Sequence, residues 1–247
     1  MTFCLGMRTH EGLVGIADTL ITSGTILTKG KKLTSITHGR GCLFLLTSGL
    51  RSIRDKTITY FEEHLGEIEQ PYSRMFKVVN ALSSSIRKVA VEDKTYLAES
   101  GLQFDIHCLV GGQMPGDREH SLYLVYPEGN WVEIGPETPY QIIGVPGYGK
   151  PILDRTFSNS DSLAFAVKVG CLAFDSTRIS AADVDFPVDL VIYRNNSFQM
   201  IEHRYQQDDL LDISTWWDNA LREAINNLPS EWMDRVLAKL DLVNGGS

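Results

Sequence analysis

Three side chains near the beginning of the sequence have types and spacing that could support acyl transfer. They are Thr2, Asp18 and a lysine of the segment GKKL, residues 30–33. A threonine hydroxyl needs a base, and a free α-amine can act as one because its pKa of about 7.7–8.0 lies near neutrality. This chemistry requires Thr2 to be the first residue, so Met1 has to be removed. A nearby lysine would lower the pKa values of the hydroxyl and the amine, and Asp18 would orient that lysine.

Two strand-like runs and a later turn would position these groups. The runs are FCLGM and GLVGIAD, and Asp18 ends the second. Further along, LFLLTSG (residues 43–49) is typical of a buried strand that runs into a turn at Ser48 and Gly49. Backbone amides exposed at such a turn can form an oxyanion hole, in which one donor contributes roughly 2.7–4 kcal/mol. We therefore expect Ser48 and Gly49 to belong to the same site.

The remaining pattern indicates which elements hold this site. We expect strands near 2–8, 12–18, 32–37, 42–47, 104–111, 121–126, 131–134, 140–143, 188–194 and 198–203. We expect helices near 50–67, 72–95, 147–158, 161–176, 207–227 and 230–240, with Pro71 and the SDS of 160–162 at two of the helix starts.

Strands joined by short turns predict two mostly antiparallel sheets with helix pairs packed outside them. The expected fold class is α+β, a four-layer αββα sandwich. Since no Pro/Gly-rich linker divides the chain, we expect a single domain over 1–247. Within it, helices of about 207–240 would serve assembly, and 244–247 would form a flexible tail.

Composition excludes several classes of function. The net charge of −8 and the absence of a Lys/Arg stripe argue against nucleic-acid binding, and no apolar run approaches a membrane span. No signal peptide is recognised, and four scattered cysteines are typical of reduced core residues, so we expect a cytoplasmic protein. The histidines are also dispersed. We therefore expect no metal site.

The residues at Thr2, Asp18, 30–33 and 43–49 resemble those of the proteasome-type N-terminal nucleophile (Ntn) hydrolases, and within them the bacterial ancestral β-subunit family, Anbu. The resemblance covers most of the chain. The segments that carry it are TFCLGMRTHEGLVGIADTLITSG (2–24), TKGKKL (28–33), LTSGLRSIRD (46–55), YGKPILDR (148–155) and SAADVDFPVDLVIYR (180–194).

The resemblance implies a role for each site residue. Thr2 would be the nucleophile with its own amine as base, Lys32 the electrostatic activator and Asp18 its partner, and Ser48 and Gly49 would supply the oxyanion amides. Lys32 is preferred because proteasome-type chains have the active lysine just before an apolar strand residue, here Leu33; Lys31 is the alternative. The family also implies no cofactor, a peptide or amide substrate, and a large homo-oligomer in the form of a ring or an open spiral.

Two departures from the proteasomal pattern are visible. Proteasomal subunits have a serine in a glycine-rich turn near the threonine, whereas IIGVPGYGKP (142–151) has none. A later supporting aspartate has three candidates: Asp183, Asp185 and Asp189.

A rival interpretation starts from the same loop. Gly144, Gly149 and Lys150 have the spacing of a phosphate-binding loop, but Pro151 stands where a Ser or Thr would be needed for Mg²⁺. A glycine-rich turn is the favoured interpretation. We expect His107 to be a strand residue without catalytic duty, and Trp216 and Trp217 to serve docking or a subunit interface.

The sequence thus predicts a threonine-type peptidase or amide hydrolase. Two alternatives remain: a non-catalytic or weakly active self-assembling scaffold, and an Ntn amidase for a small or isopeptide-like amide. The substrate and the need for an ATP-driven unfoldase are left open.

Overall fold

The computed structural model describes residues 2–23 and 26–244 of the chain. The chain divides into two compact units, Met1–Gln207 and Asp208–Ser247. The single domain expected over 1–247, with its assembly helices, remains a proposal. The expected flexible tail at 244–247 falls almost wholly outside the described residues.

The first unit is built on two five-stranded sheets within the described residues. The first sheet has the order β10-β1-β2-β11-β12 and the second the order β5-β6-β7-β8-β9; all of their pairings are antiparallel. The strands are β1 (Phe3–Thr9), β2 (Gly12–Asp18), β5 (Leu33–His38), β6 (Gly41–Gly49), β7 (Ile106–Gln113), β8 (Ser121–Val125), β9 (Trp131–Glu133), β10 (Tyr140–Gly144), β11 (Val188–Arg194) and β12 (Met200–Tyr205).

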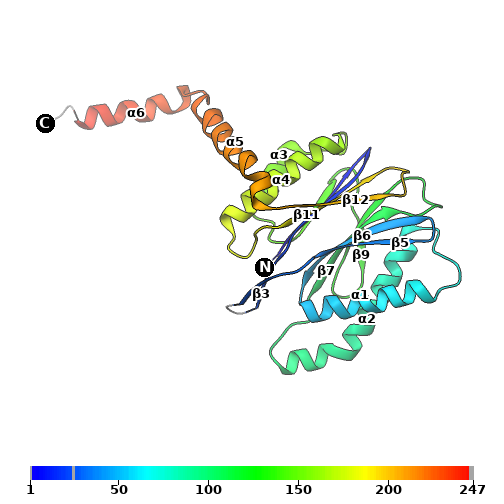
Figure 1. The fold of residues 1–247 in the computed structure, drawn as a ribbon. Helices are drawn as coiled ribbons and strands as arrows, with labels where there is room; N and C mark the ends of the chain where they lie inside the picture. Colours follow the sequence, from blue (N-terminus) through cyan, green and yellow to red (C-terminus); the bar gives the residue numbers. More distant parts are fainter. Residues whose placement is uncertain (1, 24–25, 245–247) are drawn as a thin grey trace. The chain divides into compact units, whose positions relative to one another are not determined.

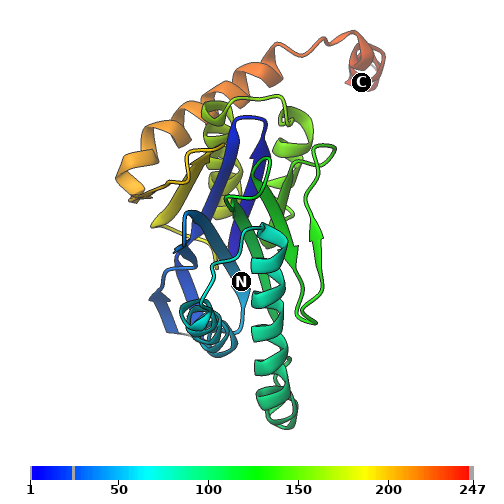
Figure 2. The ribbon, with the colours of Figure 1, turned by 90° about the vertical axis from the view of Figure 1, so that its right-hand side faces the viewer.

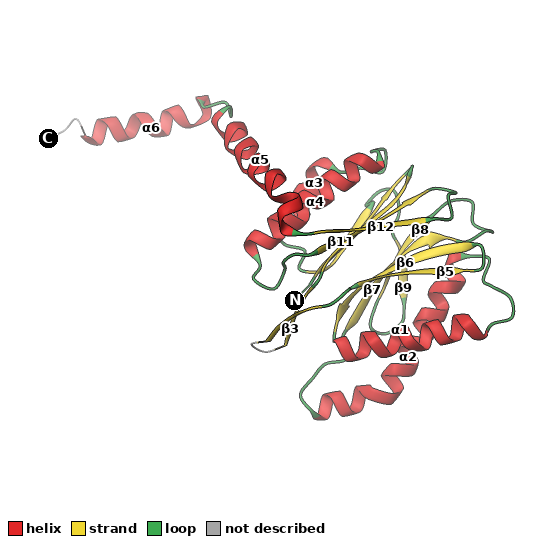
Figure 3. Cartoon of the chain, in the orientation of Figure 1, coloured by secondary structure: helices red, strands yellow, loops and turns green. Residues whose placement is uncertain are grey.

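Two helix pairs cover the outer faces of these sheets. Helices α3 (Lys150–Thr156) and α4 (Leu163–Ser180) lie outside the first sheet, and α1 (Arg51–Glu67) and α2 (Met75–Glu99) lie outside the second. Figures 1 and 3 show the resulting order of layers, and Figure 2 shows the same unit from the side. The expected α+β αββα sandwich is confirmed.

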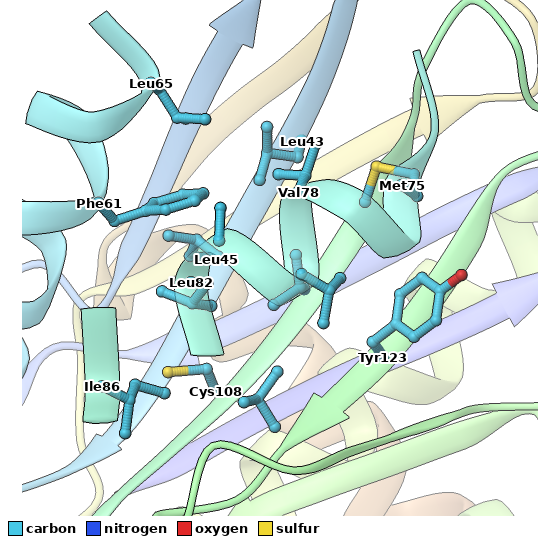
Figure 4. Packing of buried hydrophobic residues seen from close by; sticks show 14 of the residues in the cluster. Leu43, Leu45, Phe61, Leu65, Met75, Val78, Leu82, Ile86, Cys108 and Tyr123 are labelled. Carbon is cyan, nitrogen blue, oxygen red and sulfur yellow. The ribbon is translucent and has the colours of Figure 1, made fainter. Parts of the chain in front are cut away.

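Strand β6 shows why the layers form. Its side chains alternate between faces: Leu43 and Leu45 pack toward α1 and α2, whereas Phe44 and Leu46 pack toward the other sheet. Both faces are therefore buried, and the strand is apolar at nearly every position instead of at every second one. Figure 4 shows Leu43 and Leu45 against Phe61 of α1.

Two differences from the sequence prediction have physical causes. A short ribbon of β3 (Leu20–Ser23) and β4 (Ile26–Lys29) was not expected, and the side chains of β4 are exposed. Helix α2 begins at Met75 instead of near Pro71, because the Asp117 carboxylate accepts the Met75 N–H at 2.9 Å. In contrast, the expected cap of α4 is present, with Ser162 Oγ accepting the Phe165 N–H at 3.2 Å.

The second unit contains α6 (Glu231–Asn244) and all of α5 (Gln207–Asn226) except its first residue. None of the α5 side chains is buried. Trp216 is 63% exposed, and its ring stacks on that of Trp217 at 6.5 Å between centroids. Helix α5 therefore presents apolar side chains that no described residue covers.

Candidate active site

Thr2 directly precedes strand β1 and is held by the end of strand β10. Its carbonyl oxygen accepts the Val145 N–H at 2.8 Å, and its side chain is almost buried. Gly144 has a φ of +96°, and a Cβ added there would lie 1.8 Å from the Thr2 carbonyl oxygen. Only glycine allows this close approach without a shift of the backbone. The position of Thr2 thus depends on Gly144.

A buried ion pair lies behind Thr2. Lys32 Nζ is 2.7 Å from Asp18 Oδ1 and 2.8 Å from Oδ2, and the side chains are only 4% and 0% exposed. Asp18 also accepts the backbone N–H groups of Phe3 at 2.8 Å and Leu20 at 3.1 Å. Burial raises the pKa of Asp18, while the Lys32 ammonium and these N–H donors act in the opposite direction. The carboxylate therefore ties the beginnings of β1 and β3 to Lys32.

The neighbouring lysine has a different environment. Lys31 Nζ is 2.5 Å from Glu202 Oε2 at the protein surface, and its side chain is 48% exposed. Adjacent side chains of an extended chain point in opposite directions, so only one of the two lysines can reach Asp18. In this structure that residue is Lys32.

Ser48 and Gly49 end strand β6 and lead through Leu50 into α1. Gly49 has a φ of +120°, and a Cβ there would lie 2.2 Å from the Asp105 carbonyl oxygen. The same carbonyl accepts the Leu50 N–H at 2.9 Å. The turn is therefore fixed by the segment that precedes β7.

Thr2, Lys32, Ser48 and Gly49 line one cleft of about 470 Å³, which we call the nucleophile cleft. The structure thus brings these predicted residues together, with the Asp18 carboxylate directly behind Lys32. The remaining lining residues were not predicted as site residues: Leu20, Ile21, Thr22, Thr47, Leu50, Arg51, Arg54, Gln103, Asp105 and Gly144. Asp105 and Gln103 had no sequence signal, because they follow α2 far from the other residues in the chain.

None of the three candidates for a supporting aspartate is among the described residues that line this cleft. Asp189 is buried and bonded by Arg204 at 2.6 and 2.8 Å. Asp185 is exposed and accepts the N–H of Phe186 at 2.8 Å, and Asp183 is partly exposed.

The phosphate-loop interpretation does not fit the geometry. Lys150 begins α3, and its ammonium is bonded to Asp154 at 2.7 Å and to the Tyr140 hydroxyl at 3.0 Å. The Lys150 ammonium, which a phosphate would need as its partner, is therefore already paired within the protein. The loop is a glycine-rich turn into a helix.

The described residues, 2–23 and 26–244, form neither a metal cluster nor a membrane-spanning helix. No three His, Cys, Asp or Glu side chains gather there as metal ligands do. No helix in the same residues combines the length and apolar character that crossing a membrane requires. The four cysteines are buried and unpaired with one another, and burial raises the pKa of the Cys4 thiol.

The layers and the cleft together define the class of the molecule. Two stacked antiparallel sheets between helix pairs, with a threonine entering the first strand, form a proteasome-related, Ntn-type fold. No protein-family model matches the chain, and no curated protein matches it either.

Solved structures are more informative. An Anbu (Gly-1) mutant from Hyphomicrobium sp. strain MC1 is similar with a TM-score of 0.85 and 31% identity, over 92% of this chain and 99% of that one. Anbu (ancestral beta-subunit) from Yersinia bercovieri has a TM-score of 0.85 at 27% identity, covering 92% and 97% of the two chains. The helical assembly of the Anbu complex from Pseudomonas aeruginosa has a TM-score of 0.86 at 27% identity, covering 92% of this chain and 97% of that one. The chain belongs to the Anbu family.

Proposed function

We propose that the protein is a threonine-type peptidase or amide hydrolase in which Thr2, freed of Met1, is the nucleophile. The observation that carries this proposal is the buried Lys32–Asp18 ion pair, whose lysine lines the same cleft as Thr2. Burying two charges is costly, and a well-packed apolar pair would often be at least as stable. A pair kept at this place therefore supports an electrostatic role toward Thr2.

The reaction begins with transfer of the Thr2 hydroxyl proton to the Thr2 α-amine. The hydroxyl oxygen forms a bond to the amide carbon, and the oxyanion accepts hydrogen bonds from the amides at Ser48 and Gly49. The C–N bond then breaks, and the proton held by the amine goes to the leaving nitrogen. Water, deprotonated by the same amine, attacks the acyl-threonine ester and releases the acid.

Lys32 and Asp18 act on the first proton transfer. A fixed ammonium near Thr2 favours the alkoxide and the neutral amine over their protonated forms, which lowers both pKa values. Asp18 holds Lys32 by both carboxylate oxygens and also bonds the N–H of Phe3, the residue after the nucleophile. The same carboxylate thereby sets the lysine and the backbone of the nucleophile.

Self-assembly is part of the proposal. One structural neighbour is a helical assembly of the Anbu complex, and α5 exposes apolar side chains, among them Leu211, Trp216 and Leu221. We expect a homo-oligomer well above dimer mass, as a ring or an open spiral. Sedimentation velocity at micromolar concentration checks this; a stable monomer would contradict it.

The same exposed helix is what favours the second candidate function, a scaffold that assembles without turnover. The two candidates differ in a single experiment. Wild-type protein and Thr2→Ala are compared for hydrolysis of a pool of peptide anilides, with Thr138→Ala, an exposed threonine outside the nucleophile cleft, as the control. Hydrolysis that is lost only in Thr2→Ala supports the peptidase. Equal hydrolysis in Thr2→Ala excludes the threonine mechanism, and turnover of small or isopeptide-like amides alone indicates an amidase.

A further inference from the structure

A second cleft, of about 410 Å³, adjoins the nucleophile cleft. The two clefts share Ser48, Asp105 and Gly144. Because the Gly144 backbone packs directly on the Thr2 carbonyl, the second cleft begins next to the nucleophile of the proposed function. A substrate with its scissile amide at Thr2 would therefore extend into both clefts, with one side of the bond in each.

The second cleft has an apolar base and a polar rim. Buried Leu124, Ile142 and Ile143 form the base. The polar lining consists of Ser48, Asp105, His107, Tyr126 and Gln141. Among the described residues that line this cleft there is no lysine or arginine. Its fixed charge is the Asp105 carboxylate, whose side chain is 52% exposed.

Asp105 is held in place from two sides. Its carbonyl accepts the Leu50 N–H at 2.9 Å, so its backbone is anchored to the turn before α1. Its Oδ1 is 3.2 Å from His107 Nδ1, and in the tautomer with a proton on Nδ1 the imidazole donates to the carboxylate. His107 is in turn placed opposite Ser48 in the β6–β7 register and meets the Tyr126 ring edge-on.

The other polar groups complement a cation. Gln141 donates its Nε2–H to the Ile142 carbonyl at 2.9 Å, which leaves its Oε1 as an acceptor. The face of the Tyr126 ring can form a cation–π interaction with a lysine or arginine side chain. The apolar base suits the methylene groups of such a side chain, whose charged end then reaches the rim.

The nucleophile cleft has the opposite character. Arg51 and Arg54 line it, and both are bonded to Asp55, so two guanidinium groups share one carboxylate there. Asp105 lines both clefts, but no lysine or arginine is among the described residues that line the second one. A cationic substrate group is therefore disfavoured in the nucleophile cleft and favoured in the second cleft.

We propose that the second cleft is a subsite for a lysine or arginine side chain of the substrate, with Asp105 as its counterion and His107 as the positioning residue for Asp105. The subsite rests on the proposed function for its place in catalysis, but the binding of a cationic side chain can be measured without turnover. The peptides that this protein binds best would thus carry a basic residue beside the scissile bond.

The test uses the Thr2→Ala protein, which cannot cleave by the proposed mechanism, as full-length chain. Two fluorescein-labelled alanine pentapeptides differ only in a central lysine or norleucine, which has a similar length and no charge. Their dissociation constants are measured by anisotropy at pH 8, above the range in which histidine side chains ordinarily titrate. We expect the lysine peptide to bind roughly three- to fivefold more tightly, as a partly exposed ion pair allows.

Variants in the same background assign the preference to residues. Asp105→Asn should bring the ratio of the two dissociation constants to about one, while Glu137→Gln, an exposed carboxylate outside both clefts, should leave the ratio unchanged. His107→Ala should weaken the preference, and His107→Gln should restore part of it because the amide can still donate to Asp105. Rescue by glutamine separates positioning of Asp105 from a general loss of fold.

Two results would overturn the subsite: equal or undetectable binding of both peptides, or a lysine preference that survives Asp105→Asn. Neither depends on hydrolysis. If the subsite is right and wild-type protein nevertheless cleaves no peptide, the proposed threonine mechanism fails and the binding site stands.

Discussion

Lys31 and Lys32 are neighbours in the sequence, yet their ion pairs occupy opposite environments. Lys32 is 4% exposed and is hydrogen-bonded to both carboxylate oxygens of Asp18, whose side chain is fully buried. Lys31 is 48% exposed, and its partner Glu202 lies on the open surface of β12. A charge that loses its partner in the first environment cannot regain water, whereas in the second it can. The comparison shows how an extended backbone separates a buried lysine from a solvated one within two residues.

The largest contrast is expected between the two alanine variants. Lys32→Ala leaves the Asp18 carboxylate buried without its cation, and removal of one member of a buried pair can cost about 3–5 kcal/mol. Lys31→Ala should cost about 0–1 kcal/mol, as for other exposed pairs. Urea unfolding of both variants beside the wild type measures this difference. Similar losses in the free energy of unfolding for the two variants would contradict the difference between the buried and the exposed ion pair.

Lys32→Arg sharpens the same contrast with the charge kept. The planar guanidinium is longer than an ammonium and is permanently charged, so it cannot take the place of Nζ between Asp18 and Thr2. We expect Lys32→Arg to lose hydrolysis, while Lys31→Arg hydrolyses as the wild type does. Full activity of Lys32→Arg would show that any cation is sufficient there.

A smaller effect is expected from the backbone that holds Thr2. Gly144→Ala places a Cβ 1.8 Å from the Thr2 carbonyl oxygen at a φ of +96°, so the beginning of β1 has to shift. Strain of this kind costs on the order of 1–3 kcal/mol. Gly147→Ala is the matched control, because its Cβ meets no atom within 4 Å. The melting temperature and the rate of hydrolysis should both fall in Gly144→Ala and not in Gly147→Ala. Wild-type values of both in Gly144→Ala would contradict the close approach of Gly144 to the Thr2 carbonyl oxygen.

The smallest effect concerns the exposed pair and pH. Burial raises the pKa of Glu202, but the Lys31 ammonium and the nearby Arg204 guanidinium outweigh burial and leave the pKa below its ordinary 4.5. A lowered carboxylate pKa means that the pair stabilises the fold above about pH 4.5 and that this contribution is lost as the pH falls further. Wild-type protein should therefore melt slightly above Glu202→Gln at pH 7 and together with it near pH 3. A constant difference across this range would contradict the assignment.

Site residues next to apolar runs could be predicted from the sequence, whereas those from distant segments could not. Thr2, Asp18 and the Ser48–Gly49 turn were found because each ends or begins an apolar run, and the layers followed from the order of those runs. Residues that enter the site from distant segments gave no such pattern. Asp105 reaches both clefts only because β7 pairs with β6, and its partner His107 was interpreted as a plain strand residue.

The start of α2 was missed for the same reason, since its cap is the carboxylate of Asp117, more than 40 residues further along. The β3–β4 ribbon was missed because its exposed side chains Ile26 and Leu27 lack the alternation of a half-buried strand. The local periodicity of apolar residues predicts neither contacts with distant segments nor exposed two-stranded ribbons.

The central claim is that Thr2 bears a free α-amine and acts as the nucleophile, and intact mass spectrometry tests it most directly. Purified protein is treated with an electrophilic probe selective for N-terminal threonine, and the adduct is located by peptide sequencing. We expect a chain that lacks Met1 and carries one adduct on Thr2, with no adduct in Thr2→Ala. A chain without Met1 that takes no adduct, or an adduct that persists in Thr2→Ala, would contradict it.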